Sequence, residues 1–284
     1  MNINNLNSFV YIYISMTSLN GRNGTKINQL LKIWPYATVA TQSWLDKQGI
    51  YRQLSDSYCR HNWITRIDSG IYVRSSEDVD WSGALYAIQK QLGIKIHLAA
   101  ESALSIVGAG QNIPLGQGSA LWFFVDHSEA KRVPDWFEKH FASNYSIKIK
   151  YTSLFSEDHG LGLRQENIRD YDITISSNER AIMECLYLAP KAFSLEHASK
   201  LMESMRMLRP EVCQQLLMHC SSIKVKRLFL YLAELHNHNW VKLIDQSKID
   251  LGSGKRQITP NGKYVAKYKL VIACLNKHEG YDNV

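Results

Sequence analysis

The sequence predicts an α+β protein in which a small domain of three helices and a β-hairpin precedes a larger mixed α/β domain with a helical C-terminal part. Three observations support this fold class: amphipathic helical spacing over residues 26–62, two β-rich runs joined by three residues ending in Gly70, and repeated Leu- and Met-rich stretches after Ser176. A chain of 284 residues is long enough for both domains. We expect a flexible tail over residues 1–24, the small domain over 25–76 and the larger domain over 77–284.

The composition indicates a soluble, cytoplasmic protein. Hydrophobic residues make up 45% of the chain, an ordinary share for a globular protein. The apolar patch from Phe9 to Ile14 is too short to cross a bilayer and has no basic start, so neither a signal peptide nor a membrane partner is expected. The 5 cysteines are scattered without CxxC spacing, which favours free thiols in a reducing compartment over a disulfide framework.

Positive charge is concentrated in two segments. The chain carries 33 Lys+Arg against 26 Asp+Glu, for a formal net charge of +7. Residues 25–74 hold 7 basic and 3 acidic residues, and residues 221–270 hold 10 basic and 3 acidic residues. This distribution fits an anionic partner without identifying it.

Three helices are expected in the small domain. Residues 26–34 form an amphipathic stretch that ends at Pro35. Residues 41–47 form a second short helix closed by Gly49, because glycine accepts the left-handed conformation common just after a helix. The third helix is expected over residues 51–62, with an inner side made of Leu54, Tyr58 and His61.

A β-hairpin follows the third helix. Residues 63–67 and 71–74 are β-rich, and the three residues between them, 68–70, end in a glycine suited to a tight turn. Three helices followed by a hairpin are typical of a winged helix-turn-helix, in which the third helix enters the major groove of DNA. The expected contacts to bases or phosphates are Arg52, Gln53, Ser57 and Arg60 on the helix and Arg66 and Arg74 on the hairpin. The alternative is a winged helix that contacts only protein, with these residues as a solvated face.

The larger domain mixes strands and helices. Helices are expected over residues 80–92 and 102–107, and strands over 120–126, 145–155 and 172–176. Ser176 followed by Glu179 predicts a capping box that opens a helical region. Further helices are expected over 194–207, 210–220 and 224–236, and their Leu and Met stripes are interpreted as core. No element is assigned between Trp136 and His140.

Two patterns associated with nucleotide chemistry are incomplete. Gly252-Ser-Gly-Lys255 is not a phosphate-binding loop, because Ile249 takes the upstream glycine position and Arg256 replaces the required Ser or Thr. A nuclease site needs clustered carboxylates to hold Mg²⁺. The strand over residues 146–150 carries lysines without a carboxylate, and Glu157 and Asp158 are interpreted as loop residues. We therefore expect a protein without catalytic activity or cofactor.

Metal binding is also not expected. Cys213, His219 and Cys220 could contribute to a zinc site, although a buried helix face is the preferred interpretation of this segment. His236 and His238 are separated by one residue, and no third ligand is evident.

Short strings in both domains follow the order and spacing of a known family. In the first half these are QSWLDKQGI at residues 42–50, WITRIDSGIY at 63–72 and HLAAESALSIVG at 97–108. In the second half they are KVKRLFLYLAE at 224–234 and LGSGKR at 251–256. From about Lys26 to Ile272 the chain resembles the AbiEi-type antitoxins of type IV (AbiE) toxin–antitoxin systems.

The resemblance implies a DNA-binding antitoxin and transcriptional repressor. Such proteins repress their own operon through the winged helix, usually at an operator with inverted repeats, and we expect a monomer or dimer on DNA. Through the second domain they counteract a nucleotidyltransferase-like toxin without forming a stable complex. We expect an antitoxin surface with basic residues at Lys224, Lys226, Arg227, Lys255 and Arg256. The rival interpretation is a winged-helix-fused nuclease or other nucleic-acid-processing enzyme.

Overall fold

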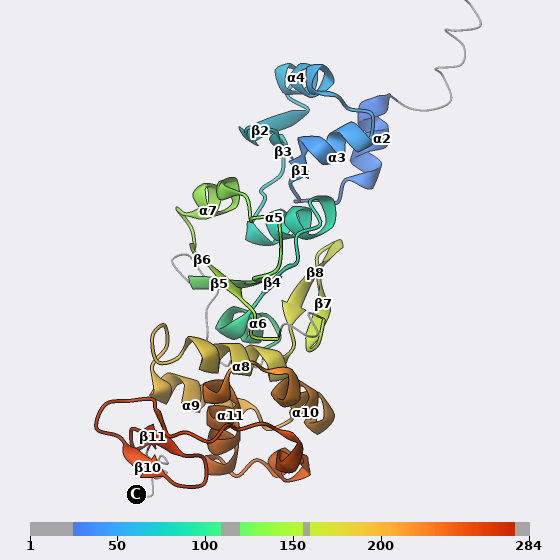
Figure 1. Cartoon of the computed structure of the whole chain (residues 1–284). Helices are drawn as coiled ribbons and strands as arrows, with labels where there is room; N and C mark the ends of the chain where they lie inside the picture. The colour runs from blue at the N-terminus through green and yellow to red at the C-terminus, as the bar shows by residue number, and fades with distance from the viewer. Residues whose placement is uncertain (1–24, 109–119, 156–159, 276–284) are drawn as a thin grey trace, which may run out of the picture. The chain divides into compact units, whose positions relative to one another are not determined.

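The computed structural model describes residues 25–108, 120–155 and 160–275 (Figure 1). The expected N-terminal tail, together with Glu157 and Asp158, lies outside these residues. The chain divides into two compact units, one formed by Met1–Leu92 with Arg169–Tyr171 and the other by Gly93–Ile168 with Asp172–Val284. Residues 77–92, which the sequence pattern placed in the larger domain, thus belong to the first unit. No helix in the described ranges is both long and apolar enough to cross a membrane.

The first unit contains three helices and a small antiparallel sheet. The helices are α2 (Lys26–Ile33), α3 (Gln42–Lys47) and α4 (Arg52–Arg60). The sheet has the order β1-β3-β2, with β1 at Ala40–Thr41, β2 at Ile64–Asp68 and β3 at Ile71–Arg74. Large apolar side chains from every helix and the sheet fill the core between them; fully buried examples are Leu30, Trp34, Leu45, Ile50, Ile64 and Tyr72.

The hairpin differs from its expected form by one residue. β2 extends to Asp68, which pairs with Ile71, so the turn consists of Ser69 and Gly70. Gly70 has a φ of 71°, a left-handed conformation in which a side chain would be strained. The register shifts between Arg66 and Asp68, and this irregularity absorbs the extra residue.

Residues 81–91 contact the rest of the first unit through a close backbone approach at Gly83 and through the buried side-chain amide of Gln91. They form α5 (Trp81–Tyr86) and the π-helical turn η3 (Ala87–Gln91). A Cβ atom at Gly83 would lie 2.0 Å from the carbonyl oxygen of Ala37, so only glycine allows this contact. The buried side chain of Gln91 accepts the backbone N–H of Thr41 at 2.8 Å and donates to the carbonyl of Val39 at 2.7 Å.

The second unit contains a mixed five-stranded sheet of order β6-β5-β4-β8-β7. Its strands are β4 (Ile96–Leu98), β5 (Ala120–Asp126), β6 (Ser146–Thr152), β7 (Leu163–Ile168) and β8 (Tyr171–Ser176). Two helices accompany it, α6 (Ala100–Ile106) and α7 (Asp135–Phe141), the latter in the stretch left unassigned from sequence. On β5, Phe123 packs edge-on against Phe137 of α7, while the next residue, Phe124, joins the main core. The sheet is therefore covered on both faces at this strand.

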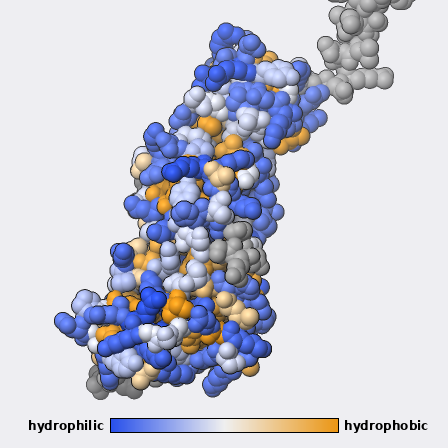
Figure 2. Space-filling view, in the orientation of Figure 1, coloured by the Kyte–Doolittle hydropathy of each residue, from blue (hydrophilic) through white to orange (hydrophobic). Residues whose placement is uncertain are grey.

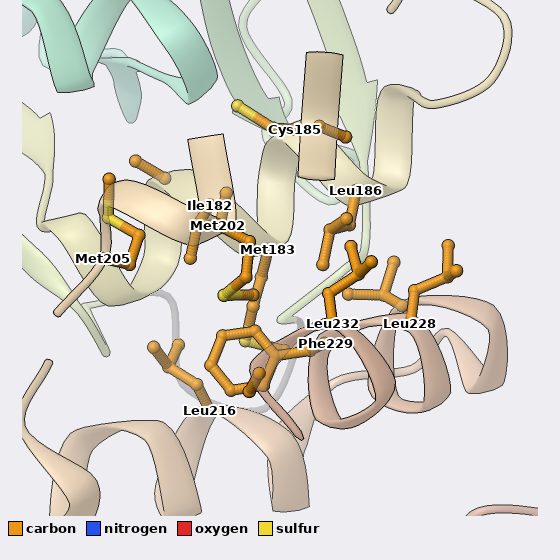
Figure 3. Packing of buried hydrophobic residues seen from close by; sticks show 14 of the residues in the cluster. Ile182, Met183, Cys185, Leu186, Met202, Met205, Leu216, Leu228, Phe229 and Leu232 are labelled. Carbon is orange, nitrogen blue, oxygen red and sulfur yellow. The ribbon is translucent and has the colours of Figure 1, made fainter. Parts of the chain in front are cut away.

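A helical region completes the second unit. It comprises α8 (Asn178–Leu188), α9 (Leu195–Ser204), α10 (Pro210–His219), α11 (Ile223–Leu235) and the short turns η4 (Asn239–Leu243) and η5 (Gln246–Lys248). A small sheet of order β10-β11-β9 follows, from Lys263–Val265, Leu270–Ile272 and Arg256–Gln257. Side chains of α8, α9 and α11, including Met183, Met202 and Phe229, meet in the core (Figure 3). The interpretation of the Leu and Met stripes as core is confirmed.

The expected capping box at the start of α8 is wrong. The residue preceding the helix is Ser177, one position later than predicted. The Ser176 hydroxyl instead donates to the carboxylate of Glu184 at 2.7 Å. Glu179 accepts two hydrogen bonds from the Arg209 guanidinium, each 3.0 Å long. Both side chains are committed to tertiary contacts, which outweigh the local capping preference.

Candidate nucleic-acid interface

Helix α4 buries one side and exposes the other. Leu54, Tyr58 and Cys59 pack against the core of the first unit, and Ser55 is fully buried. His61, which was expected to face inward, is exposed and lies just beyond the helix, where its Nδ1 is 2.8 Å from the carbonyl of Ser57. The buried side thus consists of the pairs Leu54–Ser55 and Tyr58–Cys59. Their packing determines which residues of α4 point to solvent.

The outer side of α4 carries an ordered set of polar residues. Arg52, Gln53 and Arg60 are exposed and Ser57 is half-buried. Residues four positions apart lie in one row along a helix. One row of α4 therefore holds positions 52, 56 and 60, and the adjoining row holds positions 53 and 57. Neither arginine forms an ion pair with any residue in the described part of the chain. The visible surface over α4 is hydrophilic (Figure 2).

A chain of polar contacts ties α4 to the hairpin and to α3. Arg66 on β2 forms a salt bridge with Asp56 on α4. The Arg66 guanidinium also lies 3.4 Å from the Tyr72 hydroxyl, which donates to the side-chain oxygen of Gln42 at 3.0 Å. The Gln42 amide in turn donates to Asp46 at 2.8 Å. Arg66 remains 44% exposed, so it can position α4 and still reach an anion.

Arg74 occupies a different place from the one expected of a phosphate contact. Its guanidinium donates to the carbonyl of Leu31 at 2.9 Å and to that of Trp34, at the C-terminal end of α2. It also pairs with Glu77 at 3.1 Å, and its side chain is 17% exposed. Arg74 therefore lies on the hairpin, as expected, but its guanidinium joins β3 to α2 instead of pointing freely into solvent.

Two exposed aromatic residues flank α4 and were not anticipated. Tyr51 precedes the helix and is 63% exposed, and Trp63 follows it and is 47% exposed. Exposed rings before and after a polar helix add apolar surface on which a ligand ring could stack. The sequence signal was ambiguous, because aromatic residues at these positions also fit the core pattern of a helix and a strand.

The five basic residues expected on one surface of the second unit have different environments. Arg227 is 1% exposed and donates to the carbonyls of Leu251 at 2.7 Å, Gly252 at 2.9 Å and Gly254 at 2.7 Å. It therefore holds the loop over residues 251–256, which we call the glycine loop, against α11. Lys226 is 5% exposed. The prediction that both belong to a basic surface is wrong, since α11 turns them inward.

The remaining three cations reach the surface to different degrees. Lys224 is half-buried, and its ammonium group donates to the carbonyls of Tyr187 at 2.7 Å and Ala189 at 2.5 Å. Burial, assisted by the nearby Lys191, lowers the pKa of Lys224 to about 8. Lys255 and Arg256 are exposed in the glycine loop, and the Lys255 ammonium lies 5.1 Å from the centre of the Tyr264 ring.

A buried polar cluster lies between the five-stranded sheet and α8. The carboxylate of Glu184 is fully buried and contacts the ring of His97 and Nε of Arg180, each at 2.9 Å. It also accepts the backbone N–H of Ala100 at 3.0 Å, in a residue whose φ is 50°. Burial raises the pKa of Glu184, but His97, Arg180 and the Ala100 N–H outweigh it and hold this pKa at about 2. Burial lowers the pKa of His97, so its neutral form is favoured.

The metal sites considered from sequence are not formed by the described residues. In residues 25–108, 120–155 and 160–275, no three His, Cys, Asp or Glu side chains are grouped to hold a metal ion. Cys213 and Cys220 are buried, as the preferred interpretation of their helix expected. Burial raises the pKa of both thiols, that of Cys220 to about 11. The Nε2 atom of His238 lies 2.7 Å from the carbonyl oxygen of Met202.

Comparison with known proteins identifies the family. Residues 23–115 match the model of the N-terminal domain of the AbiEi antitoxin transcriptional regulators, and residues 119–273 match the model of the AbiEi antitoxin transcriptional regulators of type IV toxin–antitoxin systems. The chain is a transcriptional regulator by class and belongs to the AbiEi antitoxin family. A search of curated protein sequences finds no match.

A solved structure shares the fold. The crystal structure of the RV2827C protein from Mycobacterium tuberculosis matches with a TM-score of 0.55 at 14% sequence identity. The match covers 86% of this chain and 88% of that chain. At this identity the likeness concerns the fold alone.

Proposed function

We propose that the chain is a DNA-binding antitoxin that represses its own toxin–antitoxin operon, and that the first unit is a winged helix-turn-helix. In this proposal α4 is the recognition helix, α3 precedes it across a short turn, and the β2–β3 hairpin is the wing. The order of these elements and membership in a family of transcriptional regulators support it. The operator carries inverted repeats, bound by a monomer or dimer.

The observation that carries this proposal is the outer face of α4. Arg52 and Arg60 are two cations, eight residues apart, that form no ion pair within the described part of the chain. They lie on a helix whose other side packs against the core. Arginine and glutamine are the side chains that read guanine and adenine through paired hydrogen bonds in the major groove. We assign base contacts to Arg52, Gln53 and Arg60, with Ser57 beside them, and phosphate contact to Arg66.

The second unit supplies the antitoxin activity in this proposal. It counteracts a nucleotidyltransferase-like toxin without a stable complex, and the family match over residues 119–273 supports the assignment to this unit. Among the basic residues expected for this role, Lys255 and Arg256 are the exposed pair. We further propose that the chain has no catalytic activity of its own, in keeping with a family of regulators and antitoxins.

A DNA-binding titration tests the first part of the proposal. The probe is the duplex immediately upstream of the gene, compared with a scrambled duplex of equal length and composition. The wild-type protein should prefer the upstream duplex, and Arg52→Ala should weaken that binding by roughly 1–3 kcal/mol. Lys139→Ala, at an exposed lysine of α7, is the matched control and should change little. Equal affinity of the wild-type protein for both duplexes would refute sequence-specific recognition.

A further inference from the structure

A second cationic surface lies in the second unit, remote in sequence from α4. Its residues come from β5, from the neighbouring edge strand β6, from the end of α8 and the segment between α8 and α9, and from the start of α11. We call it the lysine–aromatic surface and define it by Trp122, Lys148, Lys150, Tyr187, Phe193 and Lys224. None of these residues belongs to the glycine loop or to the first unit.

Strand pairing places a lysine beside each aromatic residue on one face of β5. In the parallel pair β5–β6, Trp122 is in register with Lys148, and Phe124 with Lys150. Register partners in neighbouring strands project from the same face of a sheet, so the two lysines accompany the two rings. Lys148 is exposed and Lys150 half-buried, and β6 is the edge of the sheet, so this row borders solvent.

The aromatic rings continue from the strand onto the helices. Trp122 contacts Phe193 with ring centres 5.7 Å apart, and Phe124 contacts Tyr187 at 6.3 Å. Trp122, Phe193 and Tyr187 are each only partly buried, so parts of these rings face outward. They form a short row of stacking surfaces.

Two ammonium groups converge on one of these rings. Nζ of Lys150 lies 5.9 Å and Nζ of Lys224 lies 5.7 Å from the centre of the Tyr187 ring. In the described part of the chain, no carboxylate forms an ion pair with Lys148, Lys150 or Lys224. An anion bound beside the Tyr187 ring would be attracted by both ammonium groups.

We infer that the lysine–aromatic surface binds unpaired nucleotides of a single-stranded nucleic acid. Aromatic faces accept bases by stacking, whatever the base, and lysines beside them neutralise the backbone phosphates. A duplex keeps its bases stacked inside and offers only phosphates, so it would leave the rings unused. A free nucleotide presents the same base and phosphate, and the experiment below separates it from a strand. The inference goes beyond the proposed operator binding, because it uses a different surface and a different ligand.

The test uses the full-length protein carrying Arg52→Ala and Arg60→Ala, so that α4 contributes little to binding. Fluorescence anisotropy measures its affinity for a labelled 12-nucleotide oligouridine, with unlabelled uridine monophosphate and a DNA duplex as competitors. In this background, Lys148→Gln with Lys150→Gln should weaken oligouridine binding about tenfold. The slope of log affinity against log salt should fall by about 0.7 for each phosphate contact removed. Lys139→Gln with Lys248→Gln removes the same charge elsewhere and should change affinity less than about twofold.

Substitutions of Tyr187 separate stacking from charge. Tyr187→Leu should weaken oligouridine binding about tenfold, while Tyr187→Phe should retain it, because the ring and not the hydroxyl carries the contact. Thermal unfolding of each variant checks that the fold is kept, and the exposed Lys148→Gln change tests the surface independently if Tyr187→Leu unfolds. Competition by uridine monophosphate, sensitive to the same changes, would assign the surface to a free nucleotide; its absence assigns a strand. Equal losses in the site and control lysine variants, or stronger competition by the duplex, would overturn the inference.

Discussion

The guanidinium of Arg66 on β2 forms a salt bridge with the carboxylate of Asp56 on α4, so one cation of the first unit is already matched by an anion on the helix proposed to read DNA. The pair is about half exposed on both sides, which means that water and salt weaken it. In the proposed complex with DNA, this pair would lower the positive charge that α4 presents to a phosphate.

Asp56→Asn should therefore tighten binding to non-specific duplex DNA. The change removes a negative charge from the outer side of α4 and releases Arg66 to contact phosphate. We expect a gain of about 2- to 5-fold at low salt, with a steeper salt dependence, measured by anisotropy. Asp135→Asn, which breaks an exposed pair with Lys139, is the control. A weaker affinity for Asp56→Asn would show that the salt bridge is needed to hold α4 in a binding position.

Arg74→Ala should lower the free energy of unfolding of the first unit. The guanidinium donates to two carbonyls at the end of α2 and pairs with Glu77, and these groups would lose their partner. The expected loss is roughly 1–3 kcal/mol. Arg60→Ala, at an exposed position of α4, should cost less than about 0.5 kcal/mol. Urea denaturation followed by tryptophan fluorescence compares the two; similar values would contradict the internal role of Arg74.

Arg227→Met should release the glycine loop. The methionine side chain is similar to arginine in length and in its apolar stem. It cannot donate hydrogen bonds to the carbonyls of Leu251, Gly252 and Gly254. We expect a loss of roughly 1.5–3 kcal/mol in unfolding free energy and faster amide exchange at residues 251–256, read by hydrogen–deuterium exchange. Arg256→Met in the same loop should leave both nearly unchanged, since its side chain is exposed. Unaltered exchange in Arg227→Met would mean that the loop is held by its backbone alone.

The stability of the second unit should fall as the pH drops below about 6.5. Burial lowers the pKa of His97 from 6.5, so below this value the unfolded chain binds a proton that the folded chain does not. Glu184 adds to the loss as the pH falls from 4.5 towards about 2, because its pKa is lowered in the folded state. Both groups shift the equilibrium in the same direction. The free energy of unfolding is measured by denaturant titration between pH 7.5 and pH 4.

A histidine substitution assigns that pH dependence. His97→Asn should flatten the decline between pH 6.5 and pH 5, at the cost of lower stability throughout, since the group that takes up the proton is gone. His140→Gln, at an exposed histidine of α7, serves as the comparison. If both variants kept the wild-type slope, the decline would belong to other groups.

The helices of the first unit could be predicted because their spacing is regular and Pro35 and Gly49 mark their ends. The inner face of α4 could not be placed fully. In the sequence, His61 continues the helical spacing of Leu54 and Tyr58. The helix ends at Arg60, however, and Cys59 packs against the core instead. Because the helix ends two residues earlier than expected, the side chain of His61 points away from the core.

Strands β4 and β7 gave no usable signal for a different reason. β4 has three residues, too few to show a period. β7 has the sequence LRQENI and lies at the edge of the sheet, where every one of its residues is exposed or half-buried. An edge strand of this kind needs little apolar character, so its sequence resembles a loop.

The number of charged residues in a segment does not predict how many of them reach the surface. Segment 221–270 is strongly basic, yet Arg227 and Lys226 are buried. The partners of Arg227 are backbone carbonyls 24 to 42 residues away in sequence, and every residue has a carbonyl, so the sequence does not reveal these contacts. Lys150, by contrast, lies over the ring of Tyr187, a contact across 37 residues that the pattern of its own strand does not predict.

The first unit is not one continuous stretch of chain. The hydroxyl of Ser82 in α5 lies 2.8 Å from that of Tyr171, the ring of Tyr86 is 5.2 Å from the ring of Tyr171, and Arg169 pairs with Asp80 at 3.5 Å. During synthesis these contacts stay unmade until residue 171 has left the ribosome, long after α4 has emerged. A fragment that stops at residue 92 would lack them permanently, so a test of the proposed DNA binding on that fragment would report on a looser module than the one the complete chain contains.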